Sequence, residues 1–251
     1  FNLFSNYGAS WDPTGKNILY TAITARGTRV FMQGFRPLRV KSVEVFFNEG
    51  TGSAAEWGST GRVFISKYVN RSNTDIYEYY LDGEKIYGLP TPKLRESDRI
   101  TKNSAIETEP ALSPDGRYLA LISDRTGSPQ VYVRDMQRKK LTRITENGKY
   151  NVSPSWSPDG KFIAYASRRS GVSSIYRIDP KSKEENRVTP KNMNAESPTW
   201  SPDGSMIAFS GKIGGDWKIY YSLSSGGQAV RLTNSKAGLQ ETMPSWGPSL
   251  R

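Results

Sequence analysis

Cysteine and histidine are both absent from the 251-residue chain. Without them the chain has no Ser-His-Asp or Cys-His catalytic arrangement, no His or Cys metal site and no redox dithiol. No apolar run approaches the roughly 18 residues that a membrane-spanning helix needs, so we expect no membrane insertion. Glycine-rich phosphate loops are lacking too, because Gly211–Gly215 has neither the required spacing nor a strand-to-helix setting. These absences argue against an enzyme whose chemistry lies within this chain.

Acidic residues are few relative to basic ones. The chain has 24 Asp and Glu against 35 Lys and Arg, for a formal net charge of +11. Such an excess predicts an acidic partner, although the same residues could merely solubilise outer strands. No RNA-binding signature, basic helix or basic–aromatic platform is present, so nucleic acid is not the expected partner.

What the chain does have is an internal repeat. The sequence S-P-S-W-S-P-D-G at Ser153–Gly160 returns as S-P-T-W-S-P-D-G at Ser197–Gly204, 44 residues later. A related copy, E-P-A-L-S-P-D-G, occupies Glu109–Gly116, 44 residues earlier. A fixed period of this size is typical of repeat architectures.

Each repeat is built from short strands and tight turns. After the apolar run 110–112 comes S-P-D-G, a cluster of turn-forming residues in which we expect the aspartate to hold the turn. Three further strands are predicted. Residues 118–122 form a continuous apolar run, whereas polar and apolar residues alternate in 130–134 and 139–145. No helical period is visible in the repeat. Four antiparallel strands at this period predict an all-β fold, a β-propeller in which each blade is covered by its neighbours.

Counting copies of the inner strand predicts a six-bladed propeller in a single domain, with the last blade incomplete. Residues 1–8 are too few to complete that blade, so we expect the natural chain to begin upstream of Phe1. The alternative is a five-bladed ring whose last strand is an addition outside the five blades. The predicted blades are residues 9–48, 49–103, 104–147, 148–191 and 192–235, with the partial sixth formed by 236–251 and 1–8.

Candidate functional residues gather on one predicted face, where the loop after each second strand meets the loop that enters each first strand. We expect a protein-docking surface there, with acidic groups near the channel mouth and cations further out, although ordinary solvated loops are the alternative. The inner carboxylates could also hold a Ca²⁺ ion in the central channel. The cations are Arg26, Arg71, Arg125, Arg168, Arg169 and Lys212, and the acids are Glu107, Glu109, Glu196 and Glu241.

Two enzymatic alternatives stay open at this stage. A pair of carboxylates could perform glycosidase chemistry, which requires two acids roughly 5–10 Å apart with one raised pKa. The chain could also be the propeller of a larger serine hydrolase or peptidase whose catalytic residues lie outside it.

Several motifs resemble the propeller of the TolB family, the periplasmic component of the Tol–Pal envelope system. They are Thr108–Pro110, Gly127–Tyr132, the stretch from Ser225–Gly227 to Arg231–Thr233, and the ending Pro244–Pro248. The resemblance is clear from Glu109 to Pro248. It implies a monomeric, non-enzymatic six-bladed propeller in the periplasm, preceded in the whole protein by a small α/β domain. It further implies binding to the peptidoglycan-associated lipoprotein Pal and to TolA, supporting outer-membrane integrity during division.

Overall fold

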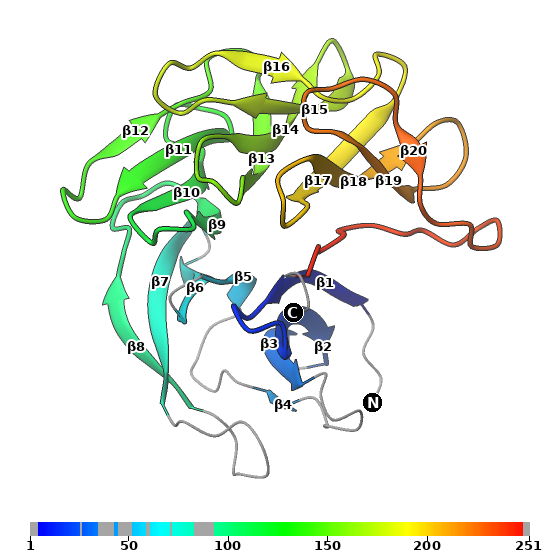
Figure 1. The fold of residues 1–251 in the computed structure, drawn as a ribbon. Coiled ribbons are helices and arrows are strands. Elements are labelled where there is room, and N and C mark those ends of the chain that lie inside the picture. The colour runs from blue at the N-terminus through cyan, green and yellow to red at the C-terminus, as the bar shows by residue number, and fades with distance from the viewer. Residues whose placement is uncertain are drawn as a thin grey trace.

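The structure is a computed structural model, and it describes residues 5–25, 27–34, 43–44, 52–58, 61–70, 72–82 and 93–247. Within these residues every regular element is a β-strand, and the strands form five separate four-stranded antiparallel sheets. Each sheet is a meander in which neighbours in sequence are neighbours in space. Figure 1 shows the five sheets arranged as blades around a centre, with the first strand of each innermost.

The blades follow the chain in order. Blade one contains β1 (Ser5–Trp11), β2 (Asn17–Thr24), β3 (Gly27–Gly34) and β4 (Val43–Glu44). Blade two contains β5 (Gly52–Trp57), β6 (Arg62–Asn70), β7 (Asn73–Asp82) and β8 (Lys93–Arg99). Blade three contains β9 (Glu107–Leu112), β10 (Tyr118–Ser123), β11 (Gln130–Asp135) and β12 (Leu141–Arg143). Blade four contains β13 (Tyr150–Trp156), β14 (Ile163–Arg169), β15 (Val172–Ile178) and β16 (Glu185–Arg187). Blade five contains β17 (Asn194–Trp200), β18 (Met206–Lys212), β19 (Lys218–Leu223) and β20 (Val230–Arg231).

The prediction of six blades is therefore wrong, and the five-bladed alternative is the arrangement found. Residues 5–8 do not belong to a separate partial blade, because they pair with β2 as the start of β1, with Ser5 opposite Ile23. The strand continues past a bulge at which Gly8 takes a φ of 62°, a conformation that glycine adopts without steric cost.

The chain beyond β20 contains no strand up to Gly247, the last residue described. It runs between blade five and blade one (Figure 1). Glu241 N–H donates to the Trp217 carbonyl (3.0 Å), but nearer the end the N–H groups bond to side chains: Met243 N–H donates to Ser210 Oγ (2.8 Å) and Trp246 N–H to Thr199 Oγ1 (3.4 Å). On the other side, Trp11 Nε1–H donates to the carbonyl of Ser245 (3.5 Å). Side-chain hydrogen bonds of this kind hold the segment in place without adding a sheet.

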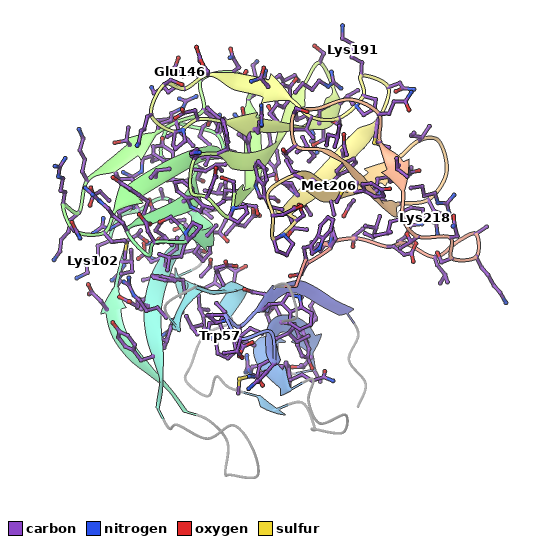
Figure 2. The ribbon with its side chains drawn as sticks, in the orientation of Figure 1. Trp57, Lys102, Glu146, Lys191, Met206 and Lys218 are labelled. Carbon is purple, nitrogen blue, oxygen red and sulfur yellow. The ribbon has the colours of Figure 1, made fainter. Side chains whose placement is uncertain are left out.

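Four apolar layers lie between successive blades in the described residues, as expected for sheets that cannot cover themselves, and a smaller cluster around Tyr20 and Phe31 lies within blade one. One layer joins blades one and two and contains Leu19, Trp57 and Ile65 (Trp57 is labelled in Figure 2). Tryptophans on the inner strands also form hydrogen bonds to the preceding blade. Trp156 Nε1–H donates to the Ala111 carbonyl and Trp200 Nε1–H to the Ser155 carbonyl, both at 3.0 Å. The indoles thus bury apolar area while their single polar group is satisfied.

The S-P-D-G turns have the structural role that their composition predicts. In blade five, Ser201 Oγ–H donates to Asp203 Oδ1 (2.6 Å), while Ser201 Oγ accepts the N–H of Met206 (2.9 Å). Hydrogen bonds from Ser201 and from the backbone N–H of Ser205 lower the pKa of Asp203 to about 2. The same serine–aspartate bond recurs at Ser113 and at Ser157.

A second repeated device follows the outer strands of blades two to five and was not recognised in the sequence. The motif is Arg, an apolar residue and Thr, as at Arg143–Thr145. Thr145 is fully buried, and its Oγ1 accepts the N–H of Val131 (3.1 Å) while its hydroxyl donates to Gln130 Oε1 (2.8 Å). Threonines in blades two, four and five make the equivalent bond, namely Thr101 to Ile76, Thr189 to Ile175 and Thr233 to Ile219.

We expect Thr145→Val to lower the free energy of unfolding by about 1–3 kcal/mol, because the buried N–H of Val131 loses its acceptor while the side-chain shape is kept. Urea unfolding monitored by tryptophan fluorescence measures this change. Thr142→Val is the matched control, since Thr142 is exposed and a surface change is expected within about 0.5 kcal/mol. Equal effects of the two substitutions would contradict the assigned role of the hydroxyl.

Candidate docking face

The antiparallel pairing brings the predicted site residues to one end of the blades. Residues that open the inner strands lie directly beside residues that close the second strands: Glu107 is opposite Ser123, Tyr150 opposite Arg168, and Asn194 opposite Lys212. The hairpin loops β2–β3, β6–β7, β10–β11, β14–β15 and β18–β19 therefore share this end with the starts of β1, β5, β9, β13 and β17. We call this end the docking face. The predicted cations Arg26 and Arg71 lie outside the described residues.

Arg125 and Glu107 are brought together, but as partners of each other. The Arg125 guanidinium forms an ion pair with Glu107 Oε1, and the Glu107 side chain is fully buried. Arg125 also lies over the ring of Tyr132, 5.4 Å from its centroid. Because each charge already has an opposite partner, this pair leaves little charge for an external ligand.

Arg169 is turned into its own blade. It binds the Glu185 carboxylate in a bidentate manner, with nitrogen–oxygen distances of 2.7 and 2.9 Å, and stacks on Tyr176 with its guanidinium carbon 3.8 Å from the ring centroid. Burial by itself would raise the pKa of Glu185, but hydrogen bonds from Arg169 and Tyr165 hold that pKa below its usual value. Because Glu185 lies on the outer strand β16, this cation is directed away from the channel.

Arg168 and Lys212 differ from these two arginines, because neither forms an ion pair within the part of the chain that the structure describes. Arg168 is exposed and lies over the ring of Tyr150, 5.1 Å from its centroid. Lys212 is half-buried at the end of β18, beside Asn194. These two cations are available to an incoming acidic group.

The inner carboxylates Glu109 and Glu196 lie near enough to influence each other. Glu109 occupies a bulge with a φ of 50°, and its Oε2 accepts the N–H of Ser153 on the next inner strand (2.6 Å). Burial raises the pKa of Glu109, and repulsion by Glu196 acts in the same direction. The two carboxylates therefore lie on the inner strands of blades three and five, on either side of blade four, close enough for their charges to interact.

Glu241 belongs to the C-terminal segment, and its Oε2 lies 3.6 Å from Lys218 Nζ. Among the described residues no three acidic side chains gather closely enough to hold a metal ion. Calcium binding stays a prediction.

Exposed apolar side chains are the feature of the docking face that the sequence interpretation missed. Their exposure ranges from 38% for Val172 to 55% for Ile213. A pattern-based reading treats apolar residues in short strands as core, so only the relative placement of the blades identifies them as surface. The set, which lies at hairpin loops or at the starts of inner strands, is Ile23, Tyr68, Val69, Ile106, Tyr150, Val172 and Ile213.

A comparison with protein families matches residues 7–250 to the TolB beta propeller domain. The chain belongs to this family. Among curated TolB proteins, the TolB homolog of Chlorobium luteolum is 31% identical over 124 residues, which are 49% of this chain and 25% of that protein. The Tol-Pal system protein TolB of Bordetella pertussis is 53% identical over 34 residues, which are 14% of this chain and 8% of that protein.

Solved structures share the fold. The crystal structure of TolB from Acinetobacter baumannii superimposes with a TM-score of 0.80 at 24% identity, over 98% of this TolB-family chain and 58% of that one. The matches to the two curated TolB proteins thus cover a quarter or less of their lengths, and this chain spans about three-fifths of the Acinetobacter structure. A puromycin-hydrolysing peptidase from Mycobacterium tuberculosis also aligns, with a TM-score of 0.66 at 10% identity. The propeller fold by itself therefore does not separate binding proteins from enzymes.

No helix among the described residues has the length and apolarity required to cross a lipid bilayer.

Proposed function

We propose that this TolB-family propeller is a non-enzymatic docking domain of the periplasmic Tol–Pal system. It binds a Pal-like, peptidoglycan-associated lipoprotein through its docking face and communicates with a TolA-like protein, which supports outer-membrane integrity. The family membership supports the general role, because the curated Bordetella relative is named as a Tol-Pal system protein. The exposed apolar side chains at the hairpin loops and inner-strand starts of the docking face carry the proposal for this molecule.

That set of side chains has the composition of a protein interface. Scattered exposed apolar residues are ordinary, but repetition at the same end of all five blades places them on a common surface. Aromatic and aliphatic residues with arginine at their edges are typical of interface centres. Tyr150 with Arg168 over its ring supplies such a combination.

The test measures binding of the soluble domain of a Pal-like lipoprotein by isothermal titration calorimetry. We expect Val172→Asp combined with Ile213→Asp to weaken binding at least about tenfold, because two apolar contacts are replaced by charges that must be desolvated. Leu223→Asp is the matched control: Leu223 is 60% exposed and lies at the opposite end of β19. The proposal fails if both proteins bind equally well, or if the control loses as much affinity as the double variant.

A separate substitution tests whether the exposed cation Arg168 contributes to binding at the docking face. Arg168→Glu is expected to reduce affinity about threefold to tenfold and to make binding less sensitive to salt, since it removes one exposed cation. The glycan-cleaving alternative predicts instead that Glu109→Gln abolishes turnover of a polysaccharide, with no effect of either apolar substitution.

A further inference from the structure

A cavity of about 260 Å³ opens between blades three and four. Its walls include the β11–β12 turn, the S-P-D-G turn of blade four and the β15–β16 turn, contributing Lys140, Gly160 and Lys181 among others. These turns lie at the opposite end of the strands from the docking hairpins, because each is one strand length away in an antiparallel meander. The cavity is therefore separate from the docking face.

The floor of this inter-blade cavity is apolar and aromatic. Tyr118 and Trp156 contribute two rings whose centroids are 6.4 Å apart and whose planes are inclined by 30°, and Val133 and Ile144 lie beside them. The Trp156 indole is held by its hydrogen bond to the Ala111 carbonyl, so it presents a fixed aromatic surface. A preformed floor of this kind lowers the ordering cost of binding.

The rim carries an excess of positive charge. Arg138, Lys140 and Lys181 are all exposed, and none of them forms an ion pair within the described residues. The one acidic residue of the lining, Asp135, is already engaged: its Oδ1 accepts the N–H groups of Gln137 (3.0 Å) and Arg138 (2.9 Å), and its Oδ2 faces Arg117 at 3.5 Å.

A second nearby acid is engaged too. Asp179 Oδ1 accepts the backbone N–H of Lys181 at 2.7 Å. Three free cations therefore border an apolar floor, which is complementary to a ligand that combines carboxylates with an aromatic group.

We propose that the inter-blade cavity is a second docking site, which binds an acidic peptide segment of a partner protein. An aromatic side chain of the peptide enters the floor beside Tyr118 and Trp156, and flanking carboxylates pair with Arg138, Lys140 and Lys181. Size favours a peptide over a nucleotide or an oligosaccharide, because small-molecule pockets typically have about 300–1,000 Å³. A cavity at or below that lower limit suits one large side chain with its backbone.

Fluorescence anisotropy of a labelled D-E-F-D-E peptide tests this site on the whole chain. We expect saturable binding that weakens at least about tenfold in the variant Lys140→Glu with Lys181→Glu, because the three rim cations become one cation and two anions. Both lysines are exposed and unpaired, so the thermal midpoint should not change. Lys191→Glu is the control of the same charge change, placed on the outer edge of the molecule away from the cavity (Figure 2).

A second peptide, D-E-A-D-E, tests whether the aromatic side chain contributes to binding. We expect about tenfold weaker binding, equivalent to about 1.4 kcal/mol. Absence of saturable binding, equal binding of the two peptides, or equal loss of affinity in the Lys191→Glu control would each overturn the site. The docking-face variants Val172→Asp and Ile213→Asp should bind the peptide normally, which separates this result from the outcome for the proposed function.

Discussion

Replacing Lys218 by methionine is expected to lower the free energy of unfolding by about 3 kcal/mol, because the ammonium group is buried and holds the C-terminal segment by several hydrogen bonds. The residue is only 4% exposed. Its Nζ donates to Ser235 Oγ and to the carbonyls of Leu239 (2.8 Å) and Lys236 (3.5 Å). Methionine retains most of the apolar stem but leaves these oxygens without their donor.

Hydrogen exchange of residues 234–243 reports the local consequence of this change. In the variant we expect protection to fall in this segment first, since its tether is lost while the strands of blade five keep their ladder. Lys236→Met is the control, because Lys236 is exposed and contributes only its backbone carbonyl to the cluster. If the two variants unfold at the same urea concentration, Lys218 does not tether the segment.

The second large effect is a pH dependence that originates at Glu56. This residue lies on the inner strand β5 and is hydrogen-bonded to Ser10 of the neighbouring inner strand β1. Burial raises the pKa of Glu56 from 4.5 to about 7, and the bond to Ser10 opposes the increase only in part. Between these two values the unfolded chain releases the proton while the folded chain retains it. The free energy of unfolding therefore falls as pH rises from 4.5 to 7, and the whole loss is present above pH 7.

Glu56→Gln removes this ionisation and is expected to stabilise the protein by about 3 kcal/mol at pH 8.5, with little change at pH 4. Urea unfolding at the two pH values measures the difference. Glu184→Gln provides the comparison, because Glu184 is exposed and should give the same small effect at both pH values. If Glu56→Gln is no more stable than the native chain at pH 8.5, ionisation of Glu56 does not destabilise the folded protein.

The repeat and its strands were predictable because they depend on local chemistry. Turn residues end each strand at a defined place, so the predicted strands 118–122 and 130–134 correspond to β10 and β11 within one residue. The position of the docking face was predictable for the same reason, since four-stranded meanders put alternate loops at the same end. The pairing of Arg125 with Glu107, and of Arg169 with Glu185, was not, because it depends on where long side chains find an opposite charge.

The number of blades shows the limit of counting motifs. Met243–Gly247 reads like an inner strand and even repeats the positive φ of the bulge, at 56°. Its N–H groups nevertheless bond to Ser210 and Thr199 side chains rather than to a partner strand, so it adds no sheet. A motif specifies a local conformation, whereas a sheet requires a second strand beside it.

The chain alone determined the all-β repeat, the turns that punctuate it and the absence of histidine and cysteine chemistry, since these follow from composition and nearest-neighbour geometry. Only the tertiary structure decided how many sheets close around the centre, which charges neutralise one another, and which apolar side chains remain in water. Those outcomes depend on contacts between residues tens of positions apart, such as Lys218 with Leu239 or Trp156 with Ala111. Local pattern carries no information about such contacts until the blades are assembled.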